Sequence, residues 1–308
     1  MRTLEYQAIE QDDGIRLELI LKRRLGLSAR QIRQLKFLSD GITVNGNRER
    51  IVYSVRSGDR IRVTFSEQNR NVQELSFLEK PLHILYEDED LLVVDKRAGE
   101  VCHPAHGHYQ DTLANQAAAY LAGRGAEKAP VRCIGRLDKD TSGTLLFAKN
   151  RLAAERLARQ KEEGVFRKEY LALVNGLFSS SERSGEICLP IAPLPGSLMK
   201  MQVAANGKRA LTRYEVLCSD RHCSLVLCRI ETGRTHQIRV HMAAIGHPLL
   251  GDPLYGNDTY VSSTRTALHA WRLYLKQPVT GEELMIESFR ENICLLYTSP
   301  SPRDSTSS

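Results

Sequence analysis

A polar turn between two apolar runs constrains the fold of this chain more than any other feature. Cys133-Ile134 precedes the turn, residues 135–143 bring ionisable groups, hydroxyls and glycines together, and Leu145–Ala148 resumes an apolar run. This pattern predicts two β-strands that fix the turn and leave its side chains free to meet a ligand. Asp138 is therefore the candidate for any chemistry at this turn.

Composition favours a soluble globular protein with one large core or two domains. The chain has 308 residues, of which 42% are hydrophobic and 26% are charged, as is usual for such proteins. No run is apolar enough to predict a membrane span or a signal peptide. The seven cysteines are scattered, without a Cys-x-x-Cys pair, which fits reduced thiols. We therefore expect a cytoplasmic monomer with no membrane contact.

Most of the net positive charge lies near the N-terminus. The whole chain carries +6, and residues 1–65 hold 13 Lys and Arg against 8 Asp and Glu. A basic small domain attached to a nearly neutral larger one suggests docking on a polyanion, for which RNA is the first candidate. The alternative is a charged surface that meets only solvent.

The N-terminal segment predicts a small α+β domain. Apolar spacing and turn residues predict helices at 16–27 and 28–38 and strands at 42–44 and 61–63. Ser28 is the expected N-cap of the second helix, and Gly26 is the expected stop of the first. The basic residues that fall mainly outside the apolar stripe are Lys22, Arg23, Arg24, Arg30, Arg33 and Lys36.

This segment resembles the S-four-type RNA-binding domain, first known from a ribosomal protein. The resemblance covers about 14–65 and rests on the two basic helices, on Val44-Asn45-Gly46 and on the Gly-Asp-x-Ile-x-Val pattern of 58–63. It implies RNA binding through Arg23, Arg24, Arg30, Arg33 and Lys36. A small α+β domain of another kind is the alternative.

Three motifs beyond residue 82 resemble the RluA-type pseudouridine synthases. The signature of that family matches Arg136-Leu137-Asp138 followed by Thr141-Ser142-Gly143. Lys168-Glu169-Tyr170 matches a second block, and TGRTHQIRVHMAAIGHPLLGDPLYG at 232–256 matches a third almost throughout. Many members carry His where this chain has Gly135. The resemblance extends to about residue 286.

The resemblance implies a fold and a domain order. We expect an α+β protein in which a small RNA-binding domain precedes a catalytic domain with a large mixed, mainly antiparallel sheet and a cleft along it. The expected segments are the S-four-like domain at 1–66, a polar linker at 67–76, the catalytic domain at 77–288 and an atypical, foreign or disordered tail at 289–308.

The resemblance also implies the reaction, which is isomerisation of uridine to pseudouridine in structured RNA, with large-subunit ribosomal RNA as the expected target. The bond between uracil N1 and the ribose breaks, the base turns, and the base rejoins the sugar through C5. The reaction has no net redox change, so we expect no cofactor and no metal. The uridine must leave its stack, which requires a pocket for a flipped base.

Each site residue takes its role from a matching motif. Asp138 attacks the sugar, stabilises its cation or deprotonates a sugar carbon, and the sequence leaves these roles open. Arg239 is its expected guanidinium partner, on a helix expected over 235–245, and Tyr170 stacks on the flipped base. The expected substrate-binding residues of these motifs are Arg136, Thr141, Arg234 and His236.

Three other readings compete with this one. An RNA-binding protein without catalysis is the first. A glycoside hydrolase is the second, but Asp138 and Asp140 stand two residues apart on a tight turn and are poorly placed across a sugar. A zinc site at His103, His106 and His108 is the third, and no neighbouring thiolate or carboxylate pattern completes a ligand set there.

Overall fold

A computed structural model describes residues 2–65, 78, 80–105, 107–124, 131–256 and 265–289. The chain forms two compact units, a smaller one within the first 73 residues and a larger one that takes most of the chain from residue 74 onward. The predicted linker at 67–76 lies outside the described residues, as does the predicted tail beyond residue 289.

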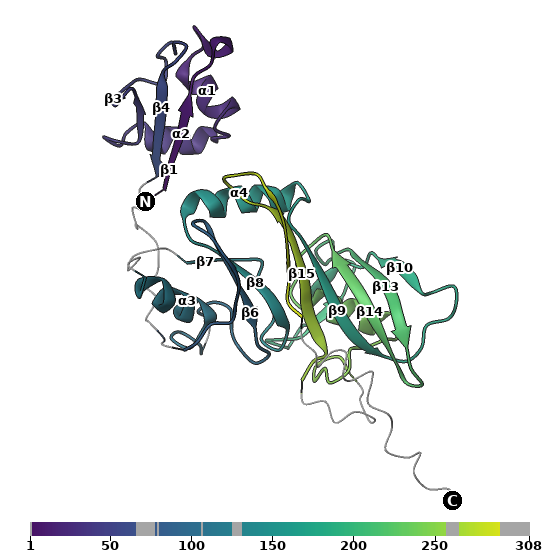
Figure 1. The fold of residues 1–308 in the computed structure, drawn as a ribbon. Coiled ribbons are helices and arrows are strands. Elements are labelled where there is room, and N and C mark those ends of the chain that lie inside the picture. Colours follow the sequence, from purple (N-terminus) through teal and green to yellow (C-terminus); the bar gives the residue numbers. More distant parts are fainter. Residues whose placement is uncertain are drawn as a thin grey trace, which may run out of the picture. The chain divides into compact units, whose positions relative to one another are not determined.

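The N-terminal unit packs two short helices against a four-stranded antiparallel sheet, ordered β1-β4-β2-β3 (Figure 1). Its elements are β1 (Arg2–Gln7), a 3-10 turn (Glu10–Asp12), α1 (Leu17–Arg23), α2 (Ala29–Leu35), β2 (Ile42–Val44), β3 (Asn47–Arg48) and β4 (Arg60–Phe65). The core of this unit contains the apolar residues that have helical spacing in the sequence, including Leu17, Ile20, Leu21, Ile32 and Leu35. The strand β1 was not predicted.

Local capping sets the helix ends in this unit. The Ser28 side chain accepts a hydrogen bond from the amide of Gln31, whose own side chain accepts from the amide of Ser28. This capping box satisfies amides that the first turn of α2 would otherwise leave open. Gly26 takes a φ of 65°, which few other residues adopt. The first helix therefore ends at Arg23 and is shorter than predicted.

The larger unit is built on a ten-stranded mixed sheet. Its main path is β10-β13-β14-β9-β15-β8-β6-β5, with β16 paired to β15 and β7 paired to β8. Figure 1 shows β6, β8, β15, β9, β14 and β13 side by side in that order. Among the described strands of this sheet, β15 and β8 form the one parallel pair. The predicted large, mainly antiparallel mixed sheet is therefore confirmed.

The elements of this unit follow the chain in order. The strands are β5 (Ile84–Glu87), β6 (Leu91–Lys96), β7 (Arg132–Ile134), β8 (Ser142–Ala148), β9 (Arg167–Asn175), β10 (Ser184–Ile187), β11 (Ile191–Pro193), β12 (Met201–Val203), β13 (Thr212–Ser219), β14 (Cys223–Ile230), β15 (Leu268–Lys276) and β16 (Glu283–Glu287). The helices are α3 (Leu113–Ala122), α4 (Arg151–Glu162) and α5 (Gln237–Ala244). Strands β11 and β12 form a separate hairpin.

The central strands are apolar on both faces because the sheet is covered on both. In β6, Leu92 packs in a cluster with residues of α3, whereas its neighbour Leu91 packs in a cluster with residues of α4. The same alternation separates Leu145 from Leu146 in β8. A strand buried on both sides reads as a continuous apolar run. Each such side chain stabilises the fold by roughly 1.5–3 kcal/mol, which fixes the frame that carries the turn at 135–141.

Strand β15 has an irregularity between Ala270 and Arg272 where it pairs with β9. The helix expected from residue 235 begins at Gln237, because His236 takes a left-handed conformation with φ 55° and ψ 22°. A left-handed residue cannot continue an α-helix, so Thr235 and His236 stand in the preceding loop.

Candidate active site

Asp138 lies in the turn between β7 and β8, and a buried lysine holds that turn from below. Lys96, the last residue of β6, is completely buried. Its Nζ donates to the backbone carbonyls of Lys139 at 2.6 Å and Thr141 at 2.7 Å, and to that of Arg97 at 3.0 Å. Burial lowers the pKa of Lys96 to about 8. The ammonium thus fixes the backbone just after Asp138.

The carboxylate of Asp138 faces a guanidinium that a second carboxylate already holds. Its Oδ2 lies 3.9 Å from Nη1 of Arg239. Nε and Nη2 of Arg239 donate to the two oxygens of Asp252, both at 2.7 Å. Arg239 is buried and Asp252 completely so, whereas the Asp138 side chain is 25% exposed. Nη1, the guanidinium nitrogen that does not bond to Asp252, is therefore the one that faces Asp138.

Asp252 stays ionised in spite of its burial. Burial by itself would raise the pKa of Asp252, but the hydrogen bonds and charge of Arg239, with the backbone amides of Leu254 and Tyr255, hold that pKa below its usual value. Burial by itself would lower the pKa of Arg239, but the hydrogen bonds and the charge of Asp252 outweigh burial and raise that pKa. The pair is a permanent ion pair with a fixed geometry.

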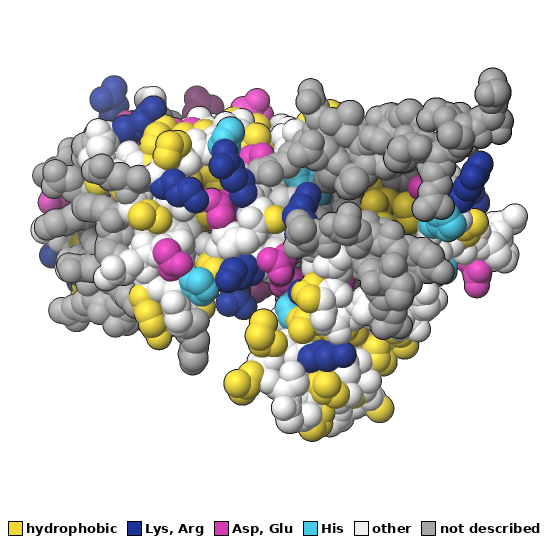
Figure 2. Space-filling view, turned by 90° about the horizontal axis from the view of Figure 1, so that it is seen from below, with side chains coloured by type: hydrophobic (Ala, Val, Ile, Leu, Met, Phe, Trp, Pro, Cys, Tyr) yellow, Lys and Arg dark blue, Asp and Glu magenta, His cyan; other side chains and the backbone are white. Residues whose placement is uncertain are grey.

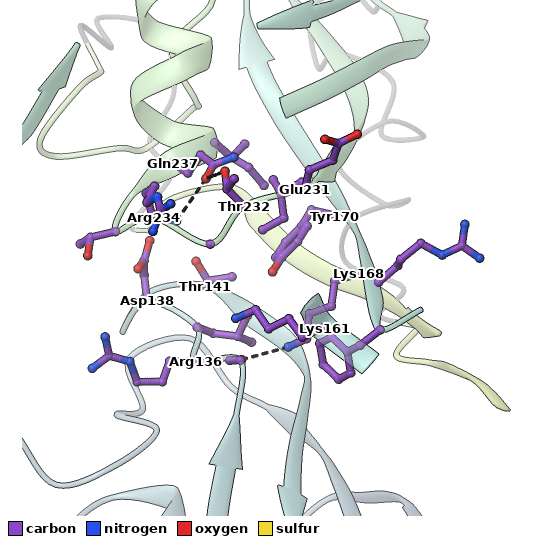
Figure 3. Close-up of a pocket in the computed structure, with 18 of the residues that line it drawn as sticks. Arg136, Asp138, Thr141, Lys161, Lys168, Tyr170, Glu231, Thr232, Arg234 and Gln237 are labelled. Atoms are coloured by element: carbon purple, nitrogen blue, oxygen red, sulfur yellow. Dashed lines mark hydrogen bonds between the residues drawn. The ribbon is translucent and has the colours of Figure 1, made fainter. Parts of the chain in front are cut away.

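Tyr170 enters the site from β9, and Figure 3 shows it, Asp138 and Thr141 around the same pocket. Alternation along β9 turns Lys168, Tyr170 and Ala172 toward the buried face. Burial raises the pKa of Tyr170 above its ordinary value, and the charge of Asp138 raises it further. The phenol therefore stays neutral and presents an aromatic ring to the cleft.

Lys168 ties β9 to the same turn. Its Nζ donates to the carbonyl of Gly135 at 3.2 Å and to that of Thr144 at 2.9 Å. Burial lowers the pKa of Lys168 to about 8. The predicted site residues did not include Lys96, Lys168 or Asp252. The sequence nevertheless held a signal for each lysine. Lys96 ends an apolar strand, and Lys168 stands two residues before Tyr170 on the same face of a strand. A lysine in such a buried position is seldom found unless its ammonium is hydrogen-bonded.

The third motif forms a tightly bonded loop before α5. The Gln237 side chain accepts from the Thr232 hydroxyl at 2.7 Å and from the Arg234 amide at 3.1 Å. The ring Nδ1 of His236 lies 3.0 Å from the hydroxyl of Tyr255, and burial lowers the pKa of His236. These bonds hold His236 in its left-handed conformation and leave the exposed Arg234 side chain at the rim.

These elements enclose an open cleft of about 1390 Å³. Of the predicted site residues, those that line it are Arg136, Asp138, Thr141, Tyr170, Arg234 and His236. Arg239 is not part of the lining, and its Nη1 lies 3.9 Å from the Asp138 carboxylate. Lys161, at the end of α4, also lines the cleft, and its Nζ would lie 3.6 Å from a Cβ on Gly233. That lysine was not predicted.

The basic residues predicted in the N-terminal unit differ in their surroundings. Arg23, Arg30 and Arg33 are exposed and have no ion pair among the described residues. Arg24 instead pairs with the buried Asp12 at 3.0 Å. Lys36 lies 4.8 Å from the centre of the Phe37 ring. In the view of Figure 2, basic side chains and histidines stand among acidic and hydrophobic ones.

Two of the competing hypotheses, the zinc site and the glycoside hydrolase, concern residues that the structure describes in part. No three His, Cys, Asp or Glu side chains within them could hold a metal ion together. His108 hydrogen-bonds Asp111 at 2.6 Å, and His106 lies outside the described residues. Asp140 does not line the cleft with Asp138, so the pair does not flank a common substrate as a glycosidase requires.

Comparison with known proteins decides the family. Residues 90–244 match the family described as RNA pseudouridylate synthase. An uncharacterized RNA pseudouridine synthase of Bacillus subtilis, YlyB, is 38% identical over 294 residues, which cover 94% of each chain. The chain belongs to the RNA pseudouridylate synthase family. It is an RNA pseudouridine synthase, as its motifs implied.

Two further similarities support this membership. Ribosomal large subunit pseudouridine synthase D of Nitrosomonas europaea is 38% identical over 93% of this chain and 84% of its own length. The structure of human RNA pseudouridylate synthase domain containing 1 has a TM-score of 0.56 and 28% identity, and covers 72% of this chain and 97% of its own.

Gly135 stands where many RluA-type pseudouridine synthases carry His. It takes a φ of 68°, in the left-handed region that strains other residues. A Cβ there would lie 3.6 Å from the Phe166 ring, which is ordinary contact. The structure therefore has room for a side chain at position 135. A substitution of Gly135 would be strained only by the left-handed backbone conformation.

Proposed function

We propose that this pseudouridine synthase converts specific uridines of large-subunit ribosomal RNA, with Asp138 as the catalytic residue. The observation that carries the proposal is the position of the Asp138 carboxylate. It is partly exposed at the cleft, lies 3.9 Å from a guanidinium that Asp252 fixes, and shares the pocket with Tyr170. The target follows the name of the Nitrosomonas europaea relative, which acts on the large ribosomal subunit.

In this proposal Tyr170 receives the flipped uracil. Stacking on an aromatic ring offsets part of the few kcal/mol that unstacking a base costs. Because burial keeps the phenol neutral, the ring is not repelled by RNA phosphates. Thr141 and His236 border the same pocket and would contact the ribose and base.

Asp138 would act on the sugar of the flipped nucleotide, as a nucleophile at C1′ or as a base at a neighbouring carbon. Either role needs the ionised carboxylate, which lies 3.9 Å from Nη1 of Arg239. During the isomerisation N1 gives up its bond to carbon and C5 forms one. The proton that leaves C5 is balanced by the one that N1 gains, so no redox partner enters.

The RNA backbone would be held by cations that no acidic side chain neutralises. Arg136, Lys161 and Arg234 line the cleft and make no ion pair with the described residues. By contrast, Glu231 at the same rim is paired with Arg213, and Glu169 with Arg229. The rim therefore leaves its positive charges free for phosphates.

The N-terminal unit would supply a second RNA contact as an S-four-like domain spanning 1–66. The exposed cations Arg23, Arg30 and Arg33 support this role, since no acidic partner neutralises them among the described residues. We further propose a cytoplasmic monomer. None of the described helices has the length and hydropathy needed to cross a membrane.

A screen of ribosomal RNA fragments tests the proposal. Transcripts that tile the large-subunit RNA are incubated with the protein, and pseudouridine is then located by chemical labelling that stops reverse transcription. We expect stops at one or a few uridines that depend on the enzyme. Binding of the fragments without any stop would instead support the RNA-binding protein without catalysis.

A further inference from the structure

His236 stands at the cleft in an unusual backbone conformation, and one nitrogen of its ring is available to a ligand. Its φ of 55° and ψ of 22° lie in the left-handed region, which is uncommon for a residue other than glycine and often marks a functional site. His236 lines the cleft that contains Asp138, and Figure 3 shows the next residue, Gln237, at the same pocket. Nδ1 of His236 contacts the Tyr255 hydroxyl, whereas Nε2 has no hydrogen-bond partner among the described residues.

The Tyr255 hydroxyl determines which ring nitrogen of His236 carries the proton. The oxygen of Tyr255 accepts a hydrogen bond from the backbone amide of Met201 at 2.8 Å. Burial raises the pKa of Tyr255, so the hydroxyl keeps its own proton. Among the described residues, the acceptor within reach of that proton is Nδ1 of His236, at 3.0 Å. We therefore assign Nδ1 as the acceptor and place the proton of the neutral imidazole on Nε2.

The surroundings hold the imidazole in this form and position. Burial lowers the pKa of His236, although the charge of Asp138 acts in the opposite direction, so the ring is neutral near pH 7. Tyr255 is itself fixed, because its backbone amide donates to Asp252 at 3.2 Å and its ring centre lies 5.2 Å from the guanidinium carbon of Arg239. Its ring meets that of His236 edge-on, with the centroids 5.7 Å apart. His236 thus offers an uncharged N–H donor with a fixed orientation.

An uncharged donor suits a carbonyl oxygen of uracil better than a phosphate, which favours a cation. In either proposed role of Asp138, the bond between N1 and C1′ breaks and its electron pair stays on the uracil. That negative charge spreads from N1 onto the oxygens O2 and O4. A preorganised N–H donor that meets a developing oxyanion typically contributes about 10²–10³-fold to turnover.

The half-turn of the uracil makes one such donor sufficient. The base turns about the axis through N3 and C6, because this turn brings C5 to the position that N1 has left. The same turn brings O4 to the position of O2. A donor at that position therefore meets a carbonyl oxygen both before and after the turn, as long as it never becomes an acceptor. The Tyr255 hydroxyl at Nδ1 keeps the proton of His236 on Nε2 and so meets this condition.

We propose that His236 is a further catalytic residue, whose Nε2–H donates to a carbonyl oxygen of the departing uracil, and that Tyr255 is the positioning residue that fixes its tautomer. The inference rests on the proposed function. The imidazole keeps its proton throughout. C5 bonds to C1′, its proton is lost, and N1 gains a proton, so the product is an isomer of uridine. Asp138 is regenerated, either when C5 displaces it from C1′ or when it returns the proton that it took from the sugar.

Two substitutions at position 236 separate the donor from the backbone conformation. The amide nitrogen of Gln lies two bonds beyond Cγ, as Nε2 does, whereas that of Asn lies one bond beyond Cγ, as Nδ1 does. Asn is the better suited of the two to a left-handed conformation. Backbone strain therefore predicts that His236→Asn is the more active variant, whereas the donor role predicts that His236→Gln is.

The experiment measures single-turnover pseudouridine formation and RNA affinity of the full-length protein on ribosomal RNA fragments. His236→Asn should be slower by about 100-fold and His236→Gln by less than about tenfold, both with unchanged RNA affinity. Tyr255→Phe keeps the ring but loses the hydroxyl, and should be slower by about tenfold because the donor loses its fixed orientation. His83→Asn is the control and should match wild type, since His83 is exposed and does not line the cleft.

The tautomer has a readout of its own, which needs no activity. Nitrogen NMR shifts distinguish a protonated Nδ1 from a protonated Nε2, and the signals of His236 are those that disappear in His236→Gln. We expect the proton on Nε2 in wild type, and a measurable fraction on Nδ1 in Tyr255→Phe.

Four results would overturn parts of the proposal. A wild-type rate in His236→Asn, or a His236→Gln rate no higher than that of His236→Asn, would refute the donor role. A proton on Nδ1 of the wild-type ring would refute the role of Tyr255. A wild-type protein that converts no uridine in any fragment would overturn the proposed function and the catalytic role of His236 together, and the NMR measurement would still decide the tautomer.

Discussion

Asp252 and Arg239 form a buried bidentate pair, with both hydrogen bonds at 2.7 Å. Thirteen positions separate them in sequence, and the loop after α5 brings them together. The pair fixes the plane of the guanidinium, so Nη1 has a defined direction toward Asp138, at 3.9 Å. The charge that faces the Asp138 carboxylate is thus oriented by Asp252, which does not itself contact Asp138.

We predict that Asp252→Asn lowers stability and activity together. Removal of one partner leaves the guanidinium of Arg239 buried without its counter-charge, which typically costs about 3–5 kcal/mol. Urea denaturation should show a lower midpoint with an unchanged slope. The exposed pair of Glu186 and Arg213 is the control, and Glu186→Gln should leave the midpoint unchanged. Equal midpoints for Asp252→Asn and wild type would show that Asp252 does not support the site.

We predict that Asp138→Asn abolishes turnover but not RNA binding. The amide keeps the shape of the side chain and removes the charge and basic lone pair that both proposed roles need. The rate should fall on the order of 10³-fold or more, because a group that acts in the transition state affects turnover more than binding. Asp140→Asn removes a charge from the same turn but not from the cleft. Comparable single-turnover rates for the two variants would refute the catalytic role of Asp138.

The buried ammonium of Lys96 gives a prediction about pH. Burial lowers its folded pKa to about 8, below the unfolded value of about 10.4. Between these values the unfolded state binds more protons, so stability rises with pH, and below about pH 8 the cost of the buried charge is fully present. The free energy of unfolding of wild type minus that of Lys96→Met should therefore increase from pH 7 to pH 10. A difference that stays constant across this range would contradict the lowered pKa.

The exposed cations of the N-terminal unit give a prediction about salt. In Arg23→Gln/Arg30→Gln/Arg33→Gln, the plot of log binding constant against log salt should flatten by about one for each phosphate that the variant no longer neutralises. Fluorescence anisotropy with a labelled ribosomal RNA fragment measures that slope. Arg24→Gln is the contrast, because Arg24 pairs with buried Asp12; it should lower the melting temperature and change the slope little. An unchanged slope in the triple variant would argue against docking by this unit.

Most of the fold could be predicted from local patterns in the sequence. Strand β8 followed from the apolar run at Leu145–Ala148, and the expected N-cap Ser28 placed the start of α2. Strand β1 was missed because Arg2–Gln7 alternates only weakly, and its partner β4 lies more than 50 residues later. A pairing over that distance depends on tertiary packing.

The candidate site could also be predicted only in part. The motifs indicated Asp138, Tyr170 and Arg239, but spacing alone could not show that Asp252 would take two nitrogens of Arg239. Nor could it show that Lys96 and Lys168 would turn inward to donate to carbonyls of the turn that carries Asp138. These contacts join segments that are distant in sequence, and each lysine becomes stable inside only when the carbonyls are in place.

The order of strands in the large sheet affects when the enzyme becomes complete during its synthesis. Strand β15 lies between β8, which follows the turn of Asp138, and β9, which carries Tyr170. Gly143 meets it so closely that a Cβ would stand 2.2 Å from the carbonyl oxygen of Ala270. A ribosome makes β8 and β9 about a hundred residues before it makes β15. The strands next to Asp138 and Tyr170 can therefore take their places in the sheet only once β15 has been made.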